Sequence, residues 1–112
     1  MPLIARDPFG GRGGETNDAL VSNGEDPLPT LCEWAGIDPP AELSGHSFAP
    51  RVRDASAPTR EEVVVETALP DGRNTPGRMV RTADYAYHLY KDGLHREQLF
   101  DLRADPGQRV NL

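Results

Sequence analysis

The sequence predicts an α+β fold in which a small antiparallel sheet of about four strands packs with one helix. Three observations support this prediction. Residues 63–102 alternate β-branched or aromatic runs with short turn sequences, as consecutive hairpins do. Residues 26–36 carry the start and stop signals of a helix. The 11 glycines and 11 prolines of the 112 residues gather mainly in predicted loops between such segments.

At the start of the chain, Leu3-Ile4-Ala5 is a short apolar run that is consistent with a buried strand. The glycine-rich residues 10–17 follow as a predicted loop. Their Gly-Gly-Arg-Gly-Gly lacks the Walker spacing and the Lys-Ser/Thr pair, so phosphate binding is not expected.

The clearest helix covers residues 26–36. Asp26 suits the N-cap, Pro27 suits the first helical position, and Gly36 can end the helix in the left-handed conformation. An apolar stripe with i, i+3, i+4, i+7 spacing is predicted to face the core; it consists of Leu28, Leu31, Cys32 and Ala35. Because Cys32 lies on this stripe, we expect a packed thiol rather than a reactive one.

Residues 41–60 are predicted to be an extended connection anchored by Leu43 and Phe48. Strands are expected at 63–69, 78–82, 85–91 and 98–102, with turns at 70–74, 83–84 and 91–93. Alternation along the third strand separates two groups onto opposite faces: Tyr85, Tyr87 and Leu89 on one, and Ala86, His88 and Tyr90 on the other.

Composition excludes several classes of function. The net charge is −6, from 18 acidic and 12 basic residues, so binding to a nucleic-acid backbone is not expected. Cys32 is the only cysteine, which rules out an internal disulfide. No apolar run is long enough for a membrane span, and the first residues do not resemble a signal peptide. The localisation is left open, with the cytoplasm as the default expectation.

Four segments carry a pattern that goes beyond composition. They are Met1-Pro2-Leu3-Ile4-Ala5-Arg6; Val21-Ser22 with Leu28-Pro29-Thr30-Leu31 and Ala35-Gly36-Ile37; Leu43-Ser44-Gly45-His46-Ser47-Phe48; and the strand pattern of residues 76–112, which closes on Asp105-Pro106-Gly107 and Asn111-Leu112. In this order they resemble the C-terminal portion of the sulfatase family, which includes arylsulfatases and N-sulfoglucosamine sulfohydrolase-like members.

The resemblance implies three parts. Residues 1–40 would be the tail end of the catalytic α/β domain, comprising a strand, the Gly-rich loop and the helix at 26–36. Residues 41–62 would be a crossover linker. Residues 63–112 would be the C-terminal antiparallel-sheet subdomain of the larger α/β sulfatase fold, ending before a final helix.

The chain departs from the family pattern at three positions. Asp7 stands where the family usually has Trp, and Pro27 replaces a usual Leu. Ala86 occupies the middle of a Tyr-Lys-Tyr pattern, so any anion contact made by that lysine is absent.

The resemblance implies that a formylglycine, made from Cys or Ser, is the nucleophile that hydrolyses the sulfate. A divalent cation, held by Asp and Asn oxygens, would activate this nucleophile. Most of these groups would lie upstream, so we expect no catalytic residue, metal ligand or cofactor in this chain, and calcium only in a complete member. Cys32 fails the nucleophile signature, which is Cys or Ser, any residue, Pro or Ala, any residue, Arg. Ser47 and Ser56 match it formally, but Ser56 precedes a predicted strand instead of opening a helix. Both matches are interpreted as coincidence.

Three side chains of the predicted sheet are candidates for contact with an anionic substrate: Arg78, Arg81 and His88. A guanidinium matches the geometry of a sulfate group, but alternation places the two arginines on opposite faces. A solvated arginine and an exposed or hydrogen-bonded imidazole are the competing interpretations. His46, His88 and His95 show no metal-ligand spacing, and Asp105 before Pro106-Gly107 is predicted to form a turn.

The expected function is therefore that of the C-terminal part of a sulfatase, a family that hydrolyses sulfate esters or N-sulfates. Alone, the chain is expected to be inactive. Its expected partner is the missing catalytic domain, with a sulfated glycan or aryl sulfate bound only by a complete enzyme. Two alternatives stay open: a free-standing acidic binding module, and a subunit that complements a separately encoded catalytic half.

Overall fold

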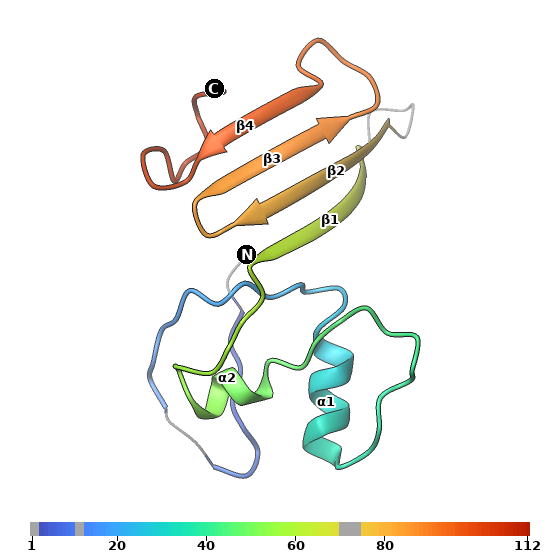
Figure 1. Cartoon of the computed structure of the whole chain (residues 1–112), viewed down its shortest axis with the longest axis vertical. Helices are drawn as coiled ribbons and strands as arrows, with labels where there is room; N and C mark the ends of the chain where they lie inside the picture. Colours follow the sequence, from blue (N-terminus) through green and yellow to red (C-terminus); the bar gives the residue numbers. More distant parts are fainter. Residues whose placement is uncertain (1–2, 11–12, 70–74) are drawn as a thin grey trace. The chain divides into compact units, whose positions relative to one another are not determined.

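The computed structural model describes residues 3–10, 13–69 and 75–112 and contains two compact units, Met1–Arg60 and Glu61–Leu112 (Figure 1). The first unit holds two helices, α1 (Pro27–Ala35) and α2 (Ala49–Arg53). The second holds four strands, β1 (Glu62–Leu69), β2 (Thr75–Thr82), β3 (Tyr85–Tyr90) and β4 (Glu97–Asp101). The predicted α+β class is confirmed. Within these residues, neither helix has the length and apolar character that a bilayer span requires.

The four strands form one antiparallel sheet in the order β1-β2-β3-β4, as predicted (Figure 1). The hairpin between β2 and β3 turns at Ala83-Asp84, and its register pairs Arg81 with Ala86. The Thr82 hydroxyl oxygen accepts hydrogen bonds from the backbone N–H groups of Asp84 and Tyr85, at 3.3 and 3.0 Å. These bonds satisfy the turn's backbone donors. The turn predicted at 70–74 lies outside the described residues.

One face of the sheet carries the core of the second unit. The register places its buried residues together on this face: Val63, Thr75, Gly77, Ala86 and Phe100. His88 lies among aromatic rings there, 5.6 Å from the Phe100 ring and 6.4 Å from the Tyr90 ring between centroids. The Tyr90 ring also covers Gly77, where a Cβ atom would lie 2.6 Å from ring carbon Cδ1. A glycine in this strand therefore makes room for an aromatic side chain.

Helix α1 begins and ends as predicted, but it buries a different face. Pro27 is at its first turn, and Gly36 ends it with φ 68° and ψ 31°. The predicted apolar stripe is wrong in part, because Leu28 and Leu31 are exposed and only Cys32 is buried. The other residues that α1 buries are Pro29 and Thr30. Contacts with distant loops, and not the apolar periodicity, select this face.

Two further expectations for the first unit are wrong. Residues 3–6 do not form a strand, and Ile4 is 95% exposed. A β-strand needs a neighbouring strand to which it hydrogen-bonds, and the described part of the first unit contains no strand. The predicted extended connection at 41–60 is interrupted by α2, which has Pro50 in its first turn, where proline is favoured.

Of the two predicted anchors of this connection, one packs. Phe48 is half-buried and meets the Trp34 ring edge-to-face, with 6.2 Å between centroids, while Ala49 beside it is fully buried. Leu43 is 37% exposed and is not an anchor. The connection is therefore held to α1 near Phe48.

Candidate functional site

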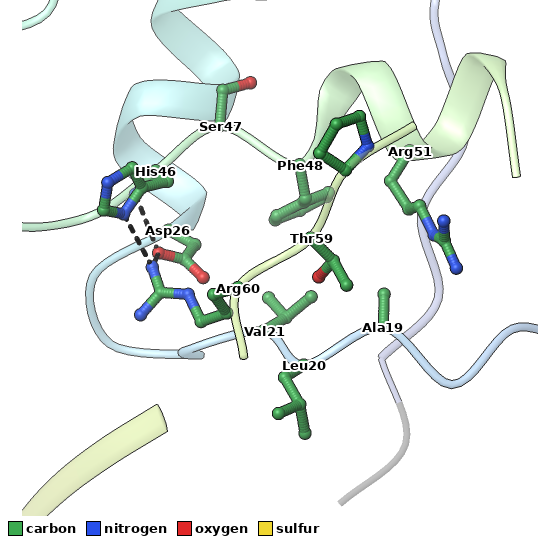
Figure 2. Close-up of a pocket in the computed structure, with 11 residues that line it drawn as sticks. Ala19, Leu20, Val21, Asp26, His46, Ser47, Phe48, Arg51, Thr59 and Arg60 are labelled. Carbon is green, nitrogen blue, oxygen red and sulfur yellow. Dashed lines mark hydrogen bonds and ion pairs between the residues drawn. The ribbon is translucent and has the colours of Figure 1, made fainter. Parts of the chain in front are cut away.

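The first unit contains a cavity of about 340 Å³, lined by residues from three segments, 19–26, 46–51 and 58–60 (Figure 2). Leu20, Val21 and Phe48 supply apolar walls. In the view of Figure 2, Asp26, His46 and Arg60 cluster on one side of the cavity, and Arg51 lies on the other. Charged groups from distant parts of the chain thus share one small space.

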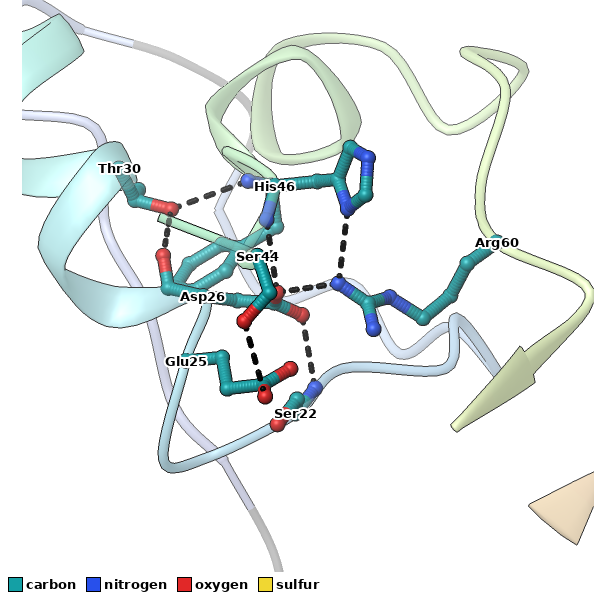
Figure 3. Close-up of polar contacts among 8 residues, drawn as sticks. Ser22, Glu25, Asp26, Thr30, Ser44, His46 and Arg60 are labelled. Carbon is teal, nitrogen blue, oxygen red and sulfur yellow. Dashed lines mark hydrogen bonds and ion pairs between the residues drawn. The ribbon is translucent and has the colours of Figure 1, made fainter. Parts of the chain in front are cut away.

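Asp26 is the centre of this cluster, and it is only 2% exposed. Its Oδ2 accepts a hydrogen bond from the backbone N–H of Ser22 at 2.7 Å (Figure 3). Its Oδ1 accepts one from the backbone N–H of His46 at 2.9 Å and another from Nη2 of Arg60. The carboxylate therefore ties three segments together at the start of α1.

This geometry corrects the predicted role of Asp26. Its backbone is already helical, with φ −78° and ψ −25°, and its side chain makes no capping hydrogen bond to α1. An N-cap side chain binds the free N–H groups of its own helix. Here the carboxylate turns away to bind loop N–H groups and a guanidinium.

Thr30 and Gly45 complete the joint between α1 and the segment that follows it. The Thr30 hydroxyl donates to the Asp26 carbonyl oxygen at 2.7 Å and accepts the Phe48 backbone N–H at 3.0 Å. At Gly45, a Cβ atom would lie 2.1 Å from the carbonyl oxygen of Glu25. Only glycine allows the two backbones to approach so closely.

The ion pair fixes the tautomer of His46. Nη2 of Arg60 lies 3.1 Å from Nδ1 of His46, and a guanidinium has only donors. Nδ1 is therefore the acceptor, and the proton of the neutral ring is on Nε2. Asp26 and Arg60 compensate each other's charge, so this arrangement joins segments and presents no free nucleophile.

A second ion pair network connects α2 to the start of the chain. Nε of Arg53 donates to Oδ2 of Asp7 at 2.6 Å, and its Nη1 donates to Oε1 of Glu33 at 2.8 Å. The backbone N–H of Phe9 also donates to Oδ1 of Asp7 at 2.8 Å. This N–H, assisted by Arg53, lowers the pKa of Asp7 below its ordinary value, and Asp7 in turn raises the pKa of Arg53.

The three candidate residues of the sheet lie in the second unit, on two faces. Arg78 and Arg81 point to opposite sides, as predicted, and Arg78 forms an ion pair with Glu66 at 2.8 Å. Arg81 shares the core face with His88. The Nε2 of His88 is buried and has no hydrogen-bond partner among the described residues. None of the three lines the cavity of the first unit.

The two formal nucleophile matches are both engaged in local structure. The Ser56 hydroxyl and backbone N–H donate to Oδ1 of Asp54 at 2.7 and 2.8 Å. The Ser47 hydroxyl oxygen accepts the Ala49 N–H at 3.2 Å. Over residues 3–10, 13–69 and 75–112, no three His, Cys, Asp or Glu side chains converge in a way that could hold a metal ion. The turn predicted at Asp105 is present, since its Oδ2 accepts the N–H of Val110 at 2.8 Å.

Comparison with known proteins identifies the family. All of residues 1–112 match the family described as N-sulphoglucosamine sulphohydrolase, C-terminal. A Delta 4,5-hexuronate-2-O-sulfatase of Bacteroides thetaiotaomicron is 44% identical over 89 residues, which cover 78% of this chain and 18% of that protein. Arylsulfatase K of Rattus norvegicus is 33% identical over 94 residues, 78% of this chain and 17% of that protein.

Solved structures agree with this assignment. The structure of a 2-O GAG sulfatase superimposes with a TM-score of 0.66 at 45% identity, over 78% of this chain and 19% of that one. The chain thus spans about a fifth of the length of each of these relatives. It belongs to the sulfatase family, as a C-terminal part of the N-sulphoglucosamine sulphohydrolase type.

Proposed function

We propose that this chain supplies the C-terminal part of a sulfatase that acts on a sulfated glycan, and that it does not hydrolyse sulfate by itself. The substrate class follows the names of the relatives, a hexuronate-2-O-sulfatase and a 2-O GAG sulfatase. Two observations support the rest: the chain spans about a fifth of these proteins, and its buried charged groups join segments of its own fold.

The role proposed for the first unit is to hold a cluster of loops against α1. Asp26 accepts hydrogen bonds from Ser22, His46 and Arg60, so both oxygens of its carboxylate are already bound. In this proposal the formylglycine nucleophile and the calcium ligands belong to the remainder of a complete enzyme. Ser56, whose hydroxyl is bound to Asp54, stays an unmodified serine.

The experiment is an activity assay of the purified 112-residue chain with 4-nitrophenyl sulfate and calcium. We expect no turnover above buffer, and mass spectrometry should find serine at positions 47 and 56. Calcium-dependent turnover that Ser56→Ala abolishes, while Ser47→Ala retains it, would refute the proposal. The Ser47→Ala variant controls for effects of removing a hydroxyl from a similar motif.

The exposed leucines of α1 favour a second candidate, a subunit that complements a separately encoded catalytic half. Leu28 is 49% exposed and Leu31 is 57% exposed, although both belong to the apolar stripe of the helix. When another polypeptide covers such exposed apolar side chains, they are removed from water and the complex is stabilised. Co-expression with an upstream sulfatase frame would test this: a stable complex that regains turnover supports it, and two proteins that purify separately contradict it.

A further inference from the structure

The turn between Ser22 and Asp26 contains an asparagine followed by a glycine. Of the four asparagines in the chain, only Asn23 precedes a glycine, which is Gly24. Both residues are exposed, whereas Ser22 and Asp26 on either side of the turn are buried. The Asn-Gly pair therefore lies on the surface, directly beside a buried carboxylate.

Two groups of this pair are not engaged in the fold. Among the described residues, the side-chain amide of Asn23 and the backbone N–H of Gly24 have no hydrogen-bond partner. The turn is closed without them, because the backbone N–H groups of Glu25 and Asp26 donate to the Ser22 carbonyl oxygen at 3.4 and 3.0 Å. Nothing lies within 4 Å of a Cβ atom built at Gly24. The Gly24 nitrogen can therefore approach the Asn23 side chain without breaking a hydrogen bond or meeting a side chain of its own residue.

From this geometry we infer that Asn23 is a site of spontaneous deamidation, with water as the co-reactant. The Gly24 backbone nitrogen gives up its proton to solvent and attacks Cγ of Asn23. A C–N bond forms, and the side-chain nitrogen leaves as ammonia. Water then opens the resulting cyclic imide at one of its two carbonyl carbons. This breaks one C–N bond and leaves either aspartate or isoaspartate at position 23, with no oxidant or reductant consumed.

Both products change the surroundings of the buried Asp26. Each adds a carboxylate three positions before it, and isoaspartate also inserts one carbon atom into the backbone of the turn. This turn positions Ser22, whose backbone N–H donates to Oδ2 of Asp26 at 2.7 Å. We expect the longer backbone to displace this donor and so to destabilise the first unit. The inference goes beyond the proposed function and does not depend on it.

The test incubates the purified 112-residue chain in mildly alkaline buffer and follows each asparagine by peptide mass spectrometry. Conversion of the amide to an acid should be at least about tenfold faster at Asn23 than at Asn17 or Asn111. Those two side chains are engaged, since Oδ1 of Asn17 accepts the Ala19 N–H at 3.0 Å and Oδ1 of Asn111 accepts the Leu99 N–H at 2.8 Å. Fragmentation that separates isoaspartate from aspartate identifies the product with the longer backbone.

Two variants isolate the role of the Gly24 nitrogen. Gly24 does not have a positive φ and has space for a Cβ atom, so Gly24→Ala should fold with an unchanged melting temperature. Its methyl group crowds the attacking nitrogen, and deamidation at Asn23 should therefore slow by about tenfold or more. Asn23→Gln retains an amide but would have to close a larger ring, so position 23 should stay unmodified over the same incubation.

Melting temperatures connect the modification to stability. Wild-type chain that has been aged until most of Asn23 is isoaspartate should melt about 4 °C or more below fresh chain. Gly24→Ala aged in parallel controls for other slow reactions, including isomerisation at Asp92-Gly93, and should melt within about 1 °C of its fresh form. Asn23→Asp adds the charge without the longer backbone, and it should lower the melting temperature by less than ageing does.

Several results would overturn the inference. One is deamidation of Asn17 or Asn111 at the rate of Asn23. Another is an unchanged rate at Asn23 in Gly24→Ala, which would mean that water, and not the Gly24 nitrogen, attacks the side chain. A third is an equal melting temperature for fresh and aged wild-type chain. A fourth is an equal loss in Asn23→Asp and in the aged chain, because the longer backbone would then have no effect.

Discussion

The backbone N–H of His46 donates a 2.9 Å hydrogen bond to Oδ1 of Asp26, a residue 20 positions earlier in the chain. The same oxygen accepts Nη2 of Arg60, 34 positions later than Asp26. Because the carboxylate is almost completely buried, these donors replace the water that it would otherwise bind. The joint at Asp26 is therefore where the separate segments of the first unit become one structure.

Replacing Asp26 by alanine should destabilise the first unit by about 3 kcal/mol or more, since it leaves the partly buried Arg60 without its counter-ion and two backbone N–H groups without an acceptor. Asp26→Asn keeps an acceptor oxygen and should cost less. Urea unfolding followed by Trp34 fluorescence measures both. Glu25→Gln is the matched control, because the hydrogen bond that Glu25 accepts from Ser44 is exposed. Equal stability of Asp26→Ala and Glu25→Gln would contradict the proposed role of the joint.

Gly45→Ala should destabilise the same unit by about 2 kcal/mol or more. A Cβ atom there would lie 2.1 Å from the Glu25 carbonyl oxygen, so backbone must move to accommodate it. Gly24→Ala is the control, because nothing lies within 4 Å of a Cβ at that position. Thermal unfolding of the two variants provides the comparison. The prediction fails if both alanine variants melt at the same temperature.

The sheet and the ends of α1 could be predicted from the sequence because local signals determine them. Alternation along residues 85–90 separated the two faces correctly, and Ala83-Asp84 marked the hairpin turn. Pro27 and Gly36 marked the limits of the helix through their backbone preferences. These signals depend on neighbours within a few residues.

The joint at Asp26 could not be predicted in this way, because its partners come from 20 and 34 positions away. An aspartate before Pro27 is equally typical of an N-cap, so the local pattern favoured the wrong role. The buried face of α1 was missed for the same reason: the buried Thr30 accepts the backbone N–H of Phe48, a contact that hydrophobic periodicity does not include. Thr30 itself, a polar residue that lies outside the predicted apolar stripe of α1, was the signal in the sequence that could have indicated this contact.

The pH dependence of stability should change when Asp7 is replaced by asparagine. The folded pKa of Asp7 lies below its ordinary value of 3.8, chiefly because of the Phe9 N–H and Arg53. Ionised Asp7 therefore contributes its full stabilisation above that ordinary value, and the contribution disappears as the pH falls through the folded pKa. Asp7→Asn should lower the melting temperature at neutral pH and flatten its decline below about pH 4.

Melting curves of both proteins between neutral and strongly acidic pH measure this difference. Asp38→Asn, at an exposed position, is the control and should follow the wild-type profile. Parallel profiles for Asp7→Asn and the wild type would show that the contacts of Asp7 with Phe9 and Arg53 add no pH-dependent stability.

The edge of β4 should become accessible to solvent when Asn111 is replaced by alanine. Oδ1 of Asn111 accepts the Leu99 N–H at 2.8 Å, and its Nδ2 donates to the Glu97 carbonyl oxygen at 3.3 Å. This side chain therefore occupies hydrogen-bonding positions that a fifth strand would use. In Asn111→Ala, the Leu99 amide should exchange its hydrogen about tenfold faster, while amides of β2 and β3 keep their rates, because only the local bond is lost. Asn17→Ala removes a side chain that accepts the exposed N–H of Ala19, and it should leave Leu99 unaffected. If all four strands instead exchanged faster together in Asn111→Ala, the asparagine would stabilise the whole sheet and not merely its edge.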